Sequence, residues 1–340
     1  MTVGGKIARG DVVQTFPLLW ELERFTWSGW RHDVDVADVP LDLTFWREPI
    51  YWPTSLIPAN WIHIASNNKE DIYSLYGVGI GAHKVQIVSL DNRGYLQEDE
   101  VTMFGEFVVH PNLGMNRLIG AYVKECGSLG VNAGEITIAA QIGNFWRIIS
   151  NIQLTNPCRV TVTNHNYLDD YLVGIGFTSV IELHDRLFRI AVVDANNFDL
   201  VGVDATSYHA YTGRGGCRRY KTLGVLPSLH GKAAMAHCTI PMDWHDGRLV
   251  SGRATVGPGT NLRRSGIMRL QMRESPSTSF RTLHYSVLSV QAPWMTEATL
   301  FPDRIPPGAD LKWVIETNEY DDTRYTAEMS FLARPRVETV

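Results

Sequence analysis

Acidic side chains are the first groups in this sequence that could do chemistry, because paired carboxylates support acid–base catalysis and metal binding. They form three local groups: 98–100, then Asp33, Asp35 and Asp38, then Asp321 and Asp322. Glycoside hydrolysis requires two carboxylates that face each other across a sugar. Here the members of each group are sequence neighbours, in predicted turns or on exposed strand faces. The run 33–38 also lacks the glycine and final glutamate of a helical calcium loop. The sequence therefore predicts neither a catalytic carboxylate pair nor a calcium site.

Histidine and cysteine show no spacing typical of a metal or nucleophile site. The histidines considered are spread along the chain: His110, His165, His209, His237 and His245. They are not accompanied by a glycine-x-serine-x-glycine nucleophile turn. The four cysteines form no C-x-x-C pair and are expected to be free thiols that pack as small apolar groups: Cys126, Cys158, Cys217 and Cys238. We therefore expect no catalytic residue, no metal, no cofactor and no enzyme activity.

A glycine-rich stretch, GVGIGAHK at 77–84, has the composition of a phosphate-binding loop. Such loops follow a strand and open a helix whose N-terminus holds the phosphate, whereas this stretch opens a predicted strand. We expect the glycines to allow a tight bend before that strand.

A basic cluster lies in GRGGCRRYK, at 213–221. It contains Arg214, Arg218, Arg219 and Lys221. These side chains could form ion pairs with another subunit or hold a nucleic-acid phosphate, or the stretch could be a solvated linker. Since the net charge is −5, a subunit contact is favoured over nucleic acid.

The chain as a whole has the composition of a folded protein with no global basic field. It has 340 residues, enough for two or three domains, and 20% of them are charged. Apolar runs are too short to span a bilayer, and the N-terminus lacks the apolar segment of a signal peptide. We expect a chain that folds in the cytosol and binds neither membrane nor nucleic acid.

Tryptophan is concentrated near the N-terminus. Six of the 10 tryptophans lie in the first 61 residues: Trp20, Trp27, Trp30, Trp46, Trp52 and Trp61. A segment with so much aromatic surface and little periodicity is predicted to be an extended arm, 1–56, that docks on its own body or on a neighbouring subunit. The alternative is an ordinary N-terminal strand layer of the first domain.

After residue 57 the pattern is that of β-strands. HKVQIVSLD and YLQEDEVTMFG flank a DNRG turn, and LFRIAVVD and NFDLVGVD flank a second turn that also begins with Asp and contains Asn. Strands separated by short turns are typical of a sandwich. We predict an all-β fold with a β-sandwich or jelly-roll-like body. A division of this body into two parts, 57–147 and 222–340, with a small β-barrel-like module inserted between them at 148–221, is what the family resemblance described next implies.

The inserted module carries a recognisable pattern. LHDRLFRIAVVDANNFDLVGVDATSYHAYTGRGG resembles a β module of tailed-bacteriophage structural proteins that is similar to the FCCH domain of ubiquitin-activating enzymes. The matching positions are Asp194, Ala195, Asn196, Phe198, Leu200, Gly202, Val203, Asp204, Thr206, Tyr208, Ala210, Tyr211, Gly215 and Gly216. The chain departs from the pattern at His184, Asp185 and Arg186, where the usual Asn-Gly is missing. The flanking segments 77–106 and 116–140 are similar to phage particle proteins of unassigned role.

The resemblance implies a non-enzymatic virion protein, assembled in the bacterial cytoplasm, with itself and other virion proteins as partners. A homo-oligomer, such as a trimer, at the tail or neck is slightly favoured over a capsid decoration or cement protein. The predicted interface residues are Trp20, Trp27, Trp30, Trp46, Trp52, Arg214, Arg218 and Arg219. Another alternative is a module that binds a host glycan through Tyr208, Tyr211 and Tyr220, unless Tyr208 and Tyr211 seal the module's core.

Overall fold

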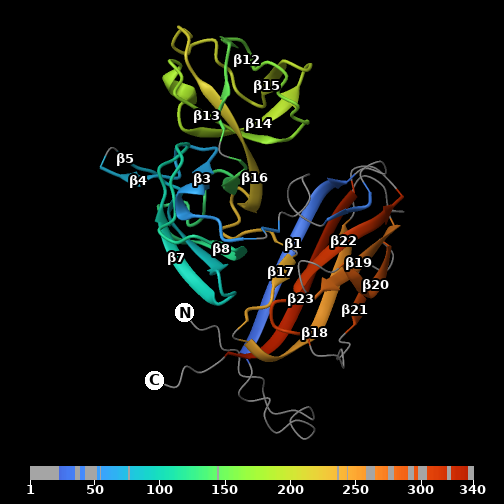
Figure 1. Cartoon of the computed structure of the whole chain (residues 1–340). Coiled ribbons are helices and arrows are strands. Elements are labelled where there is room, and N and C mark those ends of the chain that lie inside the picture. Colours follow the sequence, from blue (N-terminus) through green and yellow to red (C-terminus); the bar gives the residue numbers. More distant parts are fainter. Residues whose placement is uncertain are drawn as a thin grey trace, which may run out of the picture. The chain divides into compact units, whose positions relative to one another are not determined.

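The computed structural model describes most of the chain. The described residues are 23–34, 39–42, 52–53, 55–75, 77–143, 145–235, 237–242, 244–257, 265–274, 279–289, 295–297, 305–319 and 323–335. They form an all-β protein, as predicted, with antiparallel sheets and only short 3-10 turns among them (Figure 1). Among these residues no helix is long and apolar enough to cross a membrane.

Backbone contacts divide the chain into two compact units. The jelly-roll unit comprises Met1–Phe45, Ser89–Gln97 and Ala234–Val340, and the insert unit comprises Trp46–Val88 and Glu98–Ala233. This grouping differs from the predicted one, in which 57–147 and 222–340 belong to one body. Residues 222–233 group instead with the segment before the module, and the chain after 234 groups with the N-terminal strand.

The jelly-roll unit is built from two four-stranded paths. Its strands are β1 (Glu23–Val34), β17 (His237–Thr239), β18 (Trp244–Gly257), β19 (Ser265–Arg273), β20 (Arg281–Ser289), β21 (Met295–Glu297), β22 (Asp310–Asn318) and β23 (Thr323–Pro335). One sheet has the order β1-β23-β18-β21 and the other β17-β22-β19-β20, with the short β2 (Leu41–Asp42) beside β22. If these eight strands are counted in chain order, the first sheet contains the first, eighth, third and sixth strands. The second sheet contains the second, seventh, fourth and fifth. This connectivity is that of a jelly roll.

The two sheets of the jelly roll share one core. Along β19, buried and half-buried residues alternate, as expected for a strand with one face inward. Tyr325 of β23 is fully buried and donates a hydrogen bond to Asn318 Oδ1 of β22 at 3.0 Å, across the sandwich. Among the side chains that the structure describes, Trp313 of β22 is the largest that is fully buried. The predicted sandwich-like, jelly-roll-like body therefore lies in this unit.

β1 belongs to the jelly roll although it is far in sequence from the other seven strands. β1 pairs antiparallel with β23, from Glu23 opposite Ala333 to Val34 opposite Thr323. Part of the predicted arm is thus a sheet strand. It pairs with β23 in the jelly-roll unit and not with the first predicted domain, 57–147, as the alternative above proposed. The insert unit occupies the connection between the first and second jelly-roll strands.

The insert unit is organised around one long sheet. Its strands are β3 (Ile62–Ser66), β4 (Tyr73–Ser74), β5 (Gly77–Val78), β6 (Ala82–Leu90), β7 (Leu96–Thr102), β8 (Arg117–Cys126), β9 (Ile136–Gln141), β10 (Arg147–Ile148), β11 (Asn151–Gln153), β12 (Cys158–Thr161), β13 (Leu172–Gly176), β14 (Arg186–Val192), β15 (Asn197–Leu200) and β16 (Gly216–Leu226). The short 3-10 turns are η4 (Ala59–Trp61) and η5 (Ile181–Leu183). The long sheet has the order β11-β12-β15-β14-β13-β16-β9-β3, and β7-β6-β8 and β4-β5 form two smaller sheets.

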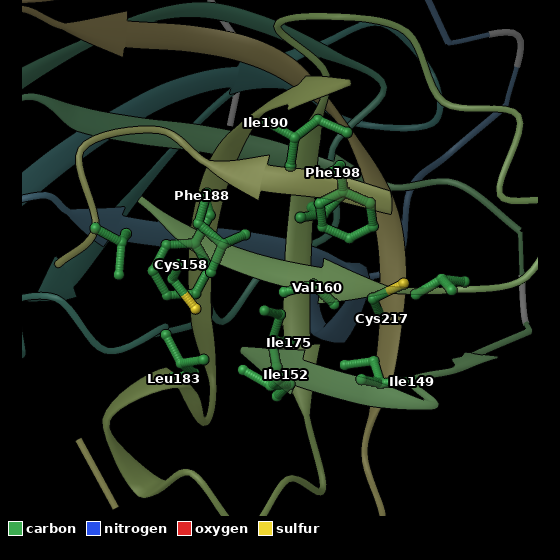
Figure 2. Close-up of a cluster of buried hydrophobic side chains, with 14 of the residues drawn as sticks. Ile149, Ile152, Cys158, Val160, Ile175, Leu183, Phe188, Ile190, Phe198 and Cys217 are labelled. Atoms are coloured by element: carbon green, nitrogen blue, oxygen red, sulfur yellow. The ribbon is translucent and has the colours of Figure 1, made fainter. Parts of the chain in front are cut away.

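The predicted module has its own hydrophobic core. Strands β10 to β16 surround a cluster of buried side chains that includes Cys158, Phe188, Ile190, Phe198 and Cys217 (Figure 2). β10 pairs with β16. The next strand, β11, pairs with β12 and lies at the end of the long sheet. The described strands do not form a closed barrel. β16 continues past the predicted boundary at residue 221, because its second half pairs with β9.

Both predicted hairpin turns are closed by an aspartate. Asp91 Oδ1 accepts hydrogen bonds from the backbone N–H groups of Arg93 and Tyr95, each at 2.8 Å, and Gly94 has φ of 80°. Asp194 Oδ1 accepts from the N–H groups of Asn196 and Asn197, at 2.7 and 3.0 Å. The turn chemistry predicted from the sequence is confirmed at both sites.

Candidate binding surfaces

The predicted tryptophan interface is only partly described. Trp20 and Trp46 lie outside the described residues, and Trp27 and Trp30 are strand positions of β1, opposite Met329 and Thr326 of β23. The ring of Trp52 is half-buried, with the Arg117 guanidinium 5.5 Å from its centroid. Trp52 therefore already contacts its own chain, and an intersubunit role for these tryptophans stays a prediction.

The three arginines of the predicted interface are not brought together. Arg214 is exposed, Arg218 lies over the Trp146 ring at 4.2 Å, and Arg219 lies over the Tyr171 ring at 3.4 Å. Arg218 and Arg219 are successive residues of β16, so their side chains leave opposite faces of the sheet. These arginines do not form a single anion-binding cluster.

The tyrosines proposed for glycan binding do not form an exposed platform. Tyr220 is fully buried, because its ring packs over Gly174 and contacts the ring of His63. Tyr208 and Tyr211 pack against the module's core, and the Tyr211 hydroxyl donates to the Ile149 carbonyl at 2.8 Å. The prediction of an exposed sugar-binding ring is wrong for Tyr220, and Tyr208 and Tyr211 take the core-sealing role given as the alternative.

Two acidic side chains of the group 98–100 make structural contacts. Asp99 accepts hydrogen bonds from the backbone of Asn112 and Leu113, at 2.6 and 2.9 Å. Glu100 pairs with Lys124 and Lys84, and these hydrogen bonds lower the pKa of its carboxyl. Asp321 and Asp322 lie outside the described residues. In the described part of the chain no three His, Cys, Asp or Glu side chains are grouped so that they could hold a metal ion.

All four cysteines are free, and three of them are buried. Burial raises the pKa of the Cys158 and Cys217 thiols to about 11. These two thiols are therefore protonated near neutral pH and unreactive. Cys126 is half-buried at the end of β8, and Cys238 is buried in β17.

A buried carboxylate that the sequence analysis did not single out fixes the entry to β6. Asp71 is fully buried, and its Oδ1 accepts from the N–H groups of Ala82 and Ala133, at 2.6 and 2.7 Å. Its Oδ2 accepts from the N–H of Gly134 at 2.8 Å and from the Ser66 hydroxyl at 2.6 Å. With four donors around it, this carboxylate joins three separate segments of the insert unit.

The Asp71 network also explains the glycines of GVGIGAHK. A Cβ at Gly81 would contact the Asp71 carboxylate and lie 2.8 Å from the backbone nitrogen of Ala133. A Cβ at Gly79 would collide with the Glu70 carbonyl. Gly79 and Gly81 are therefore needed for close backbone approach at the predicted bend, whereas a Cβ at Gly77 would have nothing within 4 Å. The stretch leads into β6 rather than into a helix.

A polar cluster lies on one face of the insert sheet. His63 of β3 contacts the rings of His110 and Tyr220, with centroids 4.7 and 4.5 Å away. Burial, followed by the nearby His110 and the Arg218 guanidinium, lowers the pKa of His63 to about 3. The His63 side chain is therefore uncharged near neutral pH.

We expect the insert unit to lose stability as the pH falls below 6.5. The unfolded chain protonates His63 at its usual pKa of 6.5, whereas the folded chain excludes the proton until the pH is near 3. The unfolded state therefore binds more protons across that window, and between pH 7 and 5 His63 alone should remove about 2 kcal/mol. Denaturant titrations of the wild type and of His63→Gln measure this effect. An unchanged pH slope in the variant would contradict the assignment.

Two strand glycines of the insert unit should respond in opposite ways to alanine. A Cβ at Gly174 would lie 2.6 Å from the Tyr220 ring, so Gly174→Ala should cost about 1–3 kcal/mol through overpacking. Gly120 in β8 has nothing within 4 Å of its Cβ position, so Gly120→Ala should be neutral or slightly stabilising. Thermal unfolding of both variants measures the difference, and equal losses would rule out the packing of Tyr220 on Gly174.

The β4-β5 hairpin presents apolar side chains to solvent. Tyr73 lies directly opposite Val78, so these two side chains share one face of the hairpin, and Leu75 and Ile80 lie in the turn after β4 and in the bend that follows β5. Tyr73, Leu75, Val78 and Ile80 are 48%, 102%, 63% and 48% exposed. We call the exposed surface defined by these four residues the hairpin face.

The module has a second set of apolar side chains that are exposed or half-buried, which we call the aromatic patch: Phe145, Trp146, Ile148 and Phe177. Phe145, Ile148 and Phe177 are 88%, 80% and 66% exposed. The Phe177 ring meets the Trp146 ring edge-on, with centroids 5.1 Å apart, and Ile148 pairs with Gly216, over which Trp146 packs. The sequence analysis missed both surfaces, because alternation identifies strand faces but not which face remains uncovered.

The chain matches no protein-family model and no curated protein.

Proposed function

We propose that this chain is a non-enzymatic structural component of a tailed bacteriophage particle, that it acts as a homo-oligomer, and that it lies at the tail or neck as an adaptor or fibre-anchoring protein. The observation that carries the proposal is the pair of uncovered apolar surfaces on the insert unit, the hairpin face and the aromatic patch. Contiguous exposed apolar side chains on a folded protein mark places where a partner binds. The resemblance of the module to phage structural proteins gives the class of assembly.

The architecture is compatible with this role. Jelly rolls occur in viral capsid proteins and in lectins, so the fold of the jelly-roll unit fits a particle component by analogy. The tail or neck position comes from the inserted module, whose pattern resembles that of tail-associated proteins. A capsid decoration or cement role is the alternative within the same class.

The polar groups of the insert unit also favour a structural role. Asp71 is saturated by four hydrogen-bond donors, and His63 is held neutral against Tyr220 and Arg218. A catalytic group needs free capacity to bind or move a proton on a substrate. These side chains instead contribute their polar atoms to the fold.

The test is quantitative mass spectrometry of purified phage particles from the source of this gene. We expect peptides of this chain in a fixed ratio to the other particle proteins, with fewer copies than the major capsid subunit if it belongs to the tail or neck. A copy number comparable with that of the capsid subunit would favour the decoration alternative. Absence of the chain from infectious particles would overturn the proposal.

A further inference from the structure

We infer that copies of this chain associate head to tail, with the hairpin face of one copy packed on the aromatic patch of the next. This inference rests on the proposed homo-oligomer and adds the two surfaces through which the copies meet. Each surface is exposed within a single copy, so neither covers the other in the same chain.

The hairpin face has the shape and chemistry of an inserting element. Its side chains are apolar, and the opposite face carries Ser74 and the small residues Gly77 and Gly79. An isolated two-stranded hairpin is marginally stable in water, and gains from a surface that covers its apolar side. The base is held by hydrogen bonds, including Tyr73 N–H to the Met103 carbonyl at 3.0 Å and Gly79 N–H to the Ile72 carbonyl at 2.9 Å. The hairpin is therefore fixed to the body, and the Tyr73 ring also contacts the His83 ring of β6, with centroids 5.1 Å apart, while Leu75 and Val78 remain mostly exposed.

The aromatic patch is held in place at an energetic cost. Phe177 has φ of 58°, in the left-handed region that bulky residues avoid. Backbone strain of this kind is concentrated at functional positions. The strained backbone holds a ring that is mostly exposed and contacts Trp146 only by its edge, so little of the ring is buried within its own chain. A role in binding a partner would explain why Phe177 keeps an unfavourable backbone conformation and a mostly exposed ring.

A second copy fits both surfaces by area and by charge. An aromatic side chain buries roughly 150–250 Å² when covered, so the exposed fractions of Tyr73, Phe145 and Phe177 offer about 400 Å². The aliphatic side chains of both surfaces add a comparable area, which approaches the roughly 1,000 Å² expected of a specific interface. The eight defining side chains carry no charge, and the Arg218 guanidinium that lies over the Trp146 ring already donates a hydrogen bond to Gln141 within its own chain. Because the two surfaces differ, the contact is heterologous and builds a ring or an open stack.

The experiment is light scattering on the full-length chain at several concentrations, with one variant for each surface. Leu75→Asp places a charge on the hairpin face, and Phe177→Asp places one on the patch at a backbone conformation that Asp accepts more readily than Phe. The matched control is Val201→Asp, which charges an exposed apolar side chain outside both surfaces. Val78→Asp and Phe177→Asn serve as second variants if circular dichroism shows that either first variant is misfolded.

We expect the wild type and Val201→Asp to form oligomers, and each surface variant alone to be monomeric. An equimolar mixture of Leu75→Asp and Phe177→Asp should give dimers, because one partner keeps its patch and the other keeps its hairpin. Oligomers that persist in both variants, or a mixture that stays monomeric, would overturn the head-to-tail contact. A monomeric wild type would overturn it as well, while the particle proteomics would still decide the proposed function separately.

Discussion

Deletion of residues 1–34 is expected to unfold the jelly-roll unit and to leave the insert unit folded. β1 pairs with β23 over almost its whole length, so its loss turns β23 into a long unpaired edge and uncovers one side of the sandwich. The insert unit has its own sheets and buried core, and does not need β1 for them. Calorimetry should show that the truncated chain loses one of the two unfolding transitions of the wild type.

The matched control for this truncation is deletion of residues 1–22, which keeps all of β1. We expect that chain to retain both transitions. Limited proteolysis followed by mass spectrometry should leave protected fragments within 46–88 and 98–233 only in the longer deletion. A chain without residues 1–34 that keeps a folded C-terminal part would show that the jelly roll does not depend on its first strand.

Replacement of Asp71 by alanine is expected to be the most damaging single substitution in the insert unit. The change leaves three backbone N–H groups and the Ser66 hydroxyl buried without their acceptor. Each unsatisfied buried donor costs roughly 1–3 kcal/mol, so after relaxation we expect a loss of about 3–5 kcal/mol. In a unit of this size the midpoint of thermal unfolding should fall by about 6–20 °C.

Two further variants separate the buried network from a general effect of removing an aspartate. Asp71→Asn keeps the side chain's size but turns one acceptor into a donor, so we expect an intermediate loss. Asp194→Ala removes a carboxylate that also accepts backbone hydrogen bonds, but in an exposed turn where water replaces it, and should have a much smaller effect. Similar losses for Asp71→Ala and Asp194→Ala would contradict the role assigned to the buried carboxylate.

Local features of this fold could be predicted from the sequence because local chemistry determines them. An aspartate that accepts hydrogen bonds from backbone groups two to four residues later closes a turn whatever surrounds it, as at Asp91 and Asp194. Alternating apolar residues likewise predicted strands such as β15, whose half-buried and buried positions alternate. The all-β fold follows from these local patterns.

Pairing between distant segments could not be predicted in the same way. Nothing in the residues of β1 indicates that the partner is β23, because strand pairing depends on which faces and edges remain after the rest has folded. The boundary at residue 221 falls inside β16, where one uninterrupted strand pairs first with β13 and then with β9. No turn or change of composition marks that change of partner.

Side-chain burial at the candidate sites was the least predictable property. Tyr220 and Phe177 are both aromatic residues of the module, yet Tyr220 is fully buried and Phe177 is mostly exposed. Tyr220 is buried because Gly174 on the neighbouring strand leaves room for its ring. Asp71 was not singled out from the sequence, because an acidic residue becomes buried only when N–H groups from distant segments converge on it.

Cryo-electron microscopy of the phage particle tests the central claim most directly. The account predicts density for the jelly-roll and insert units at symmetry-related positions in the tail or neck, with each β4-β5 hairpin covered by a neighbouring copy. A complete reconstruction of the infectious particle in which no density fits this chain would contradict it.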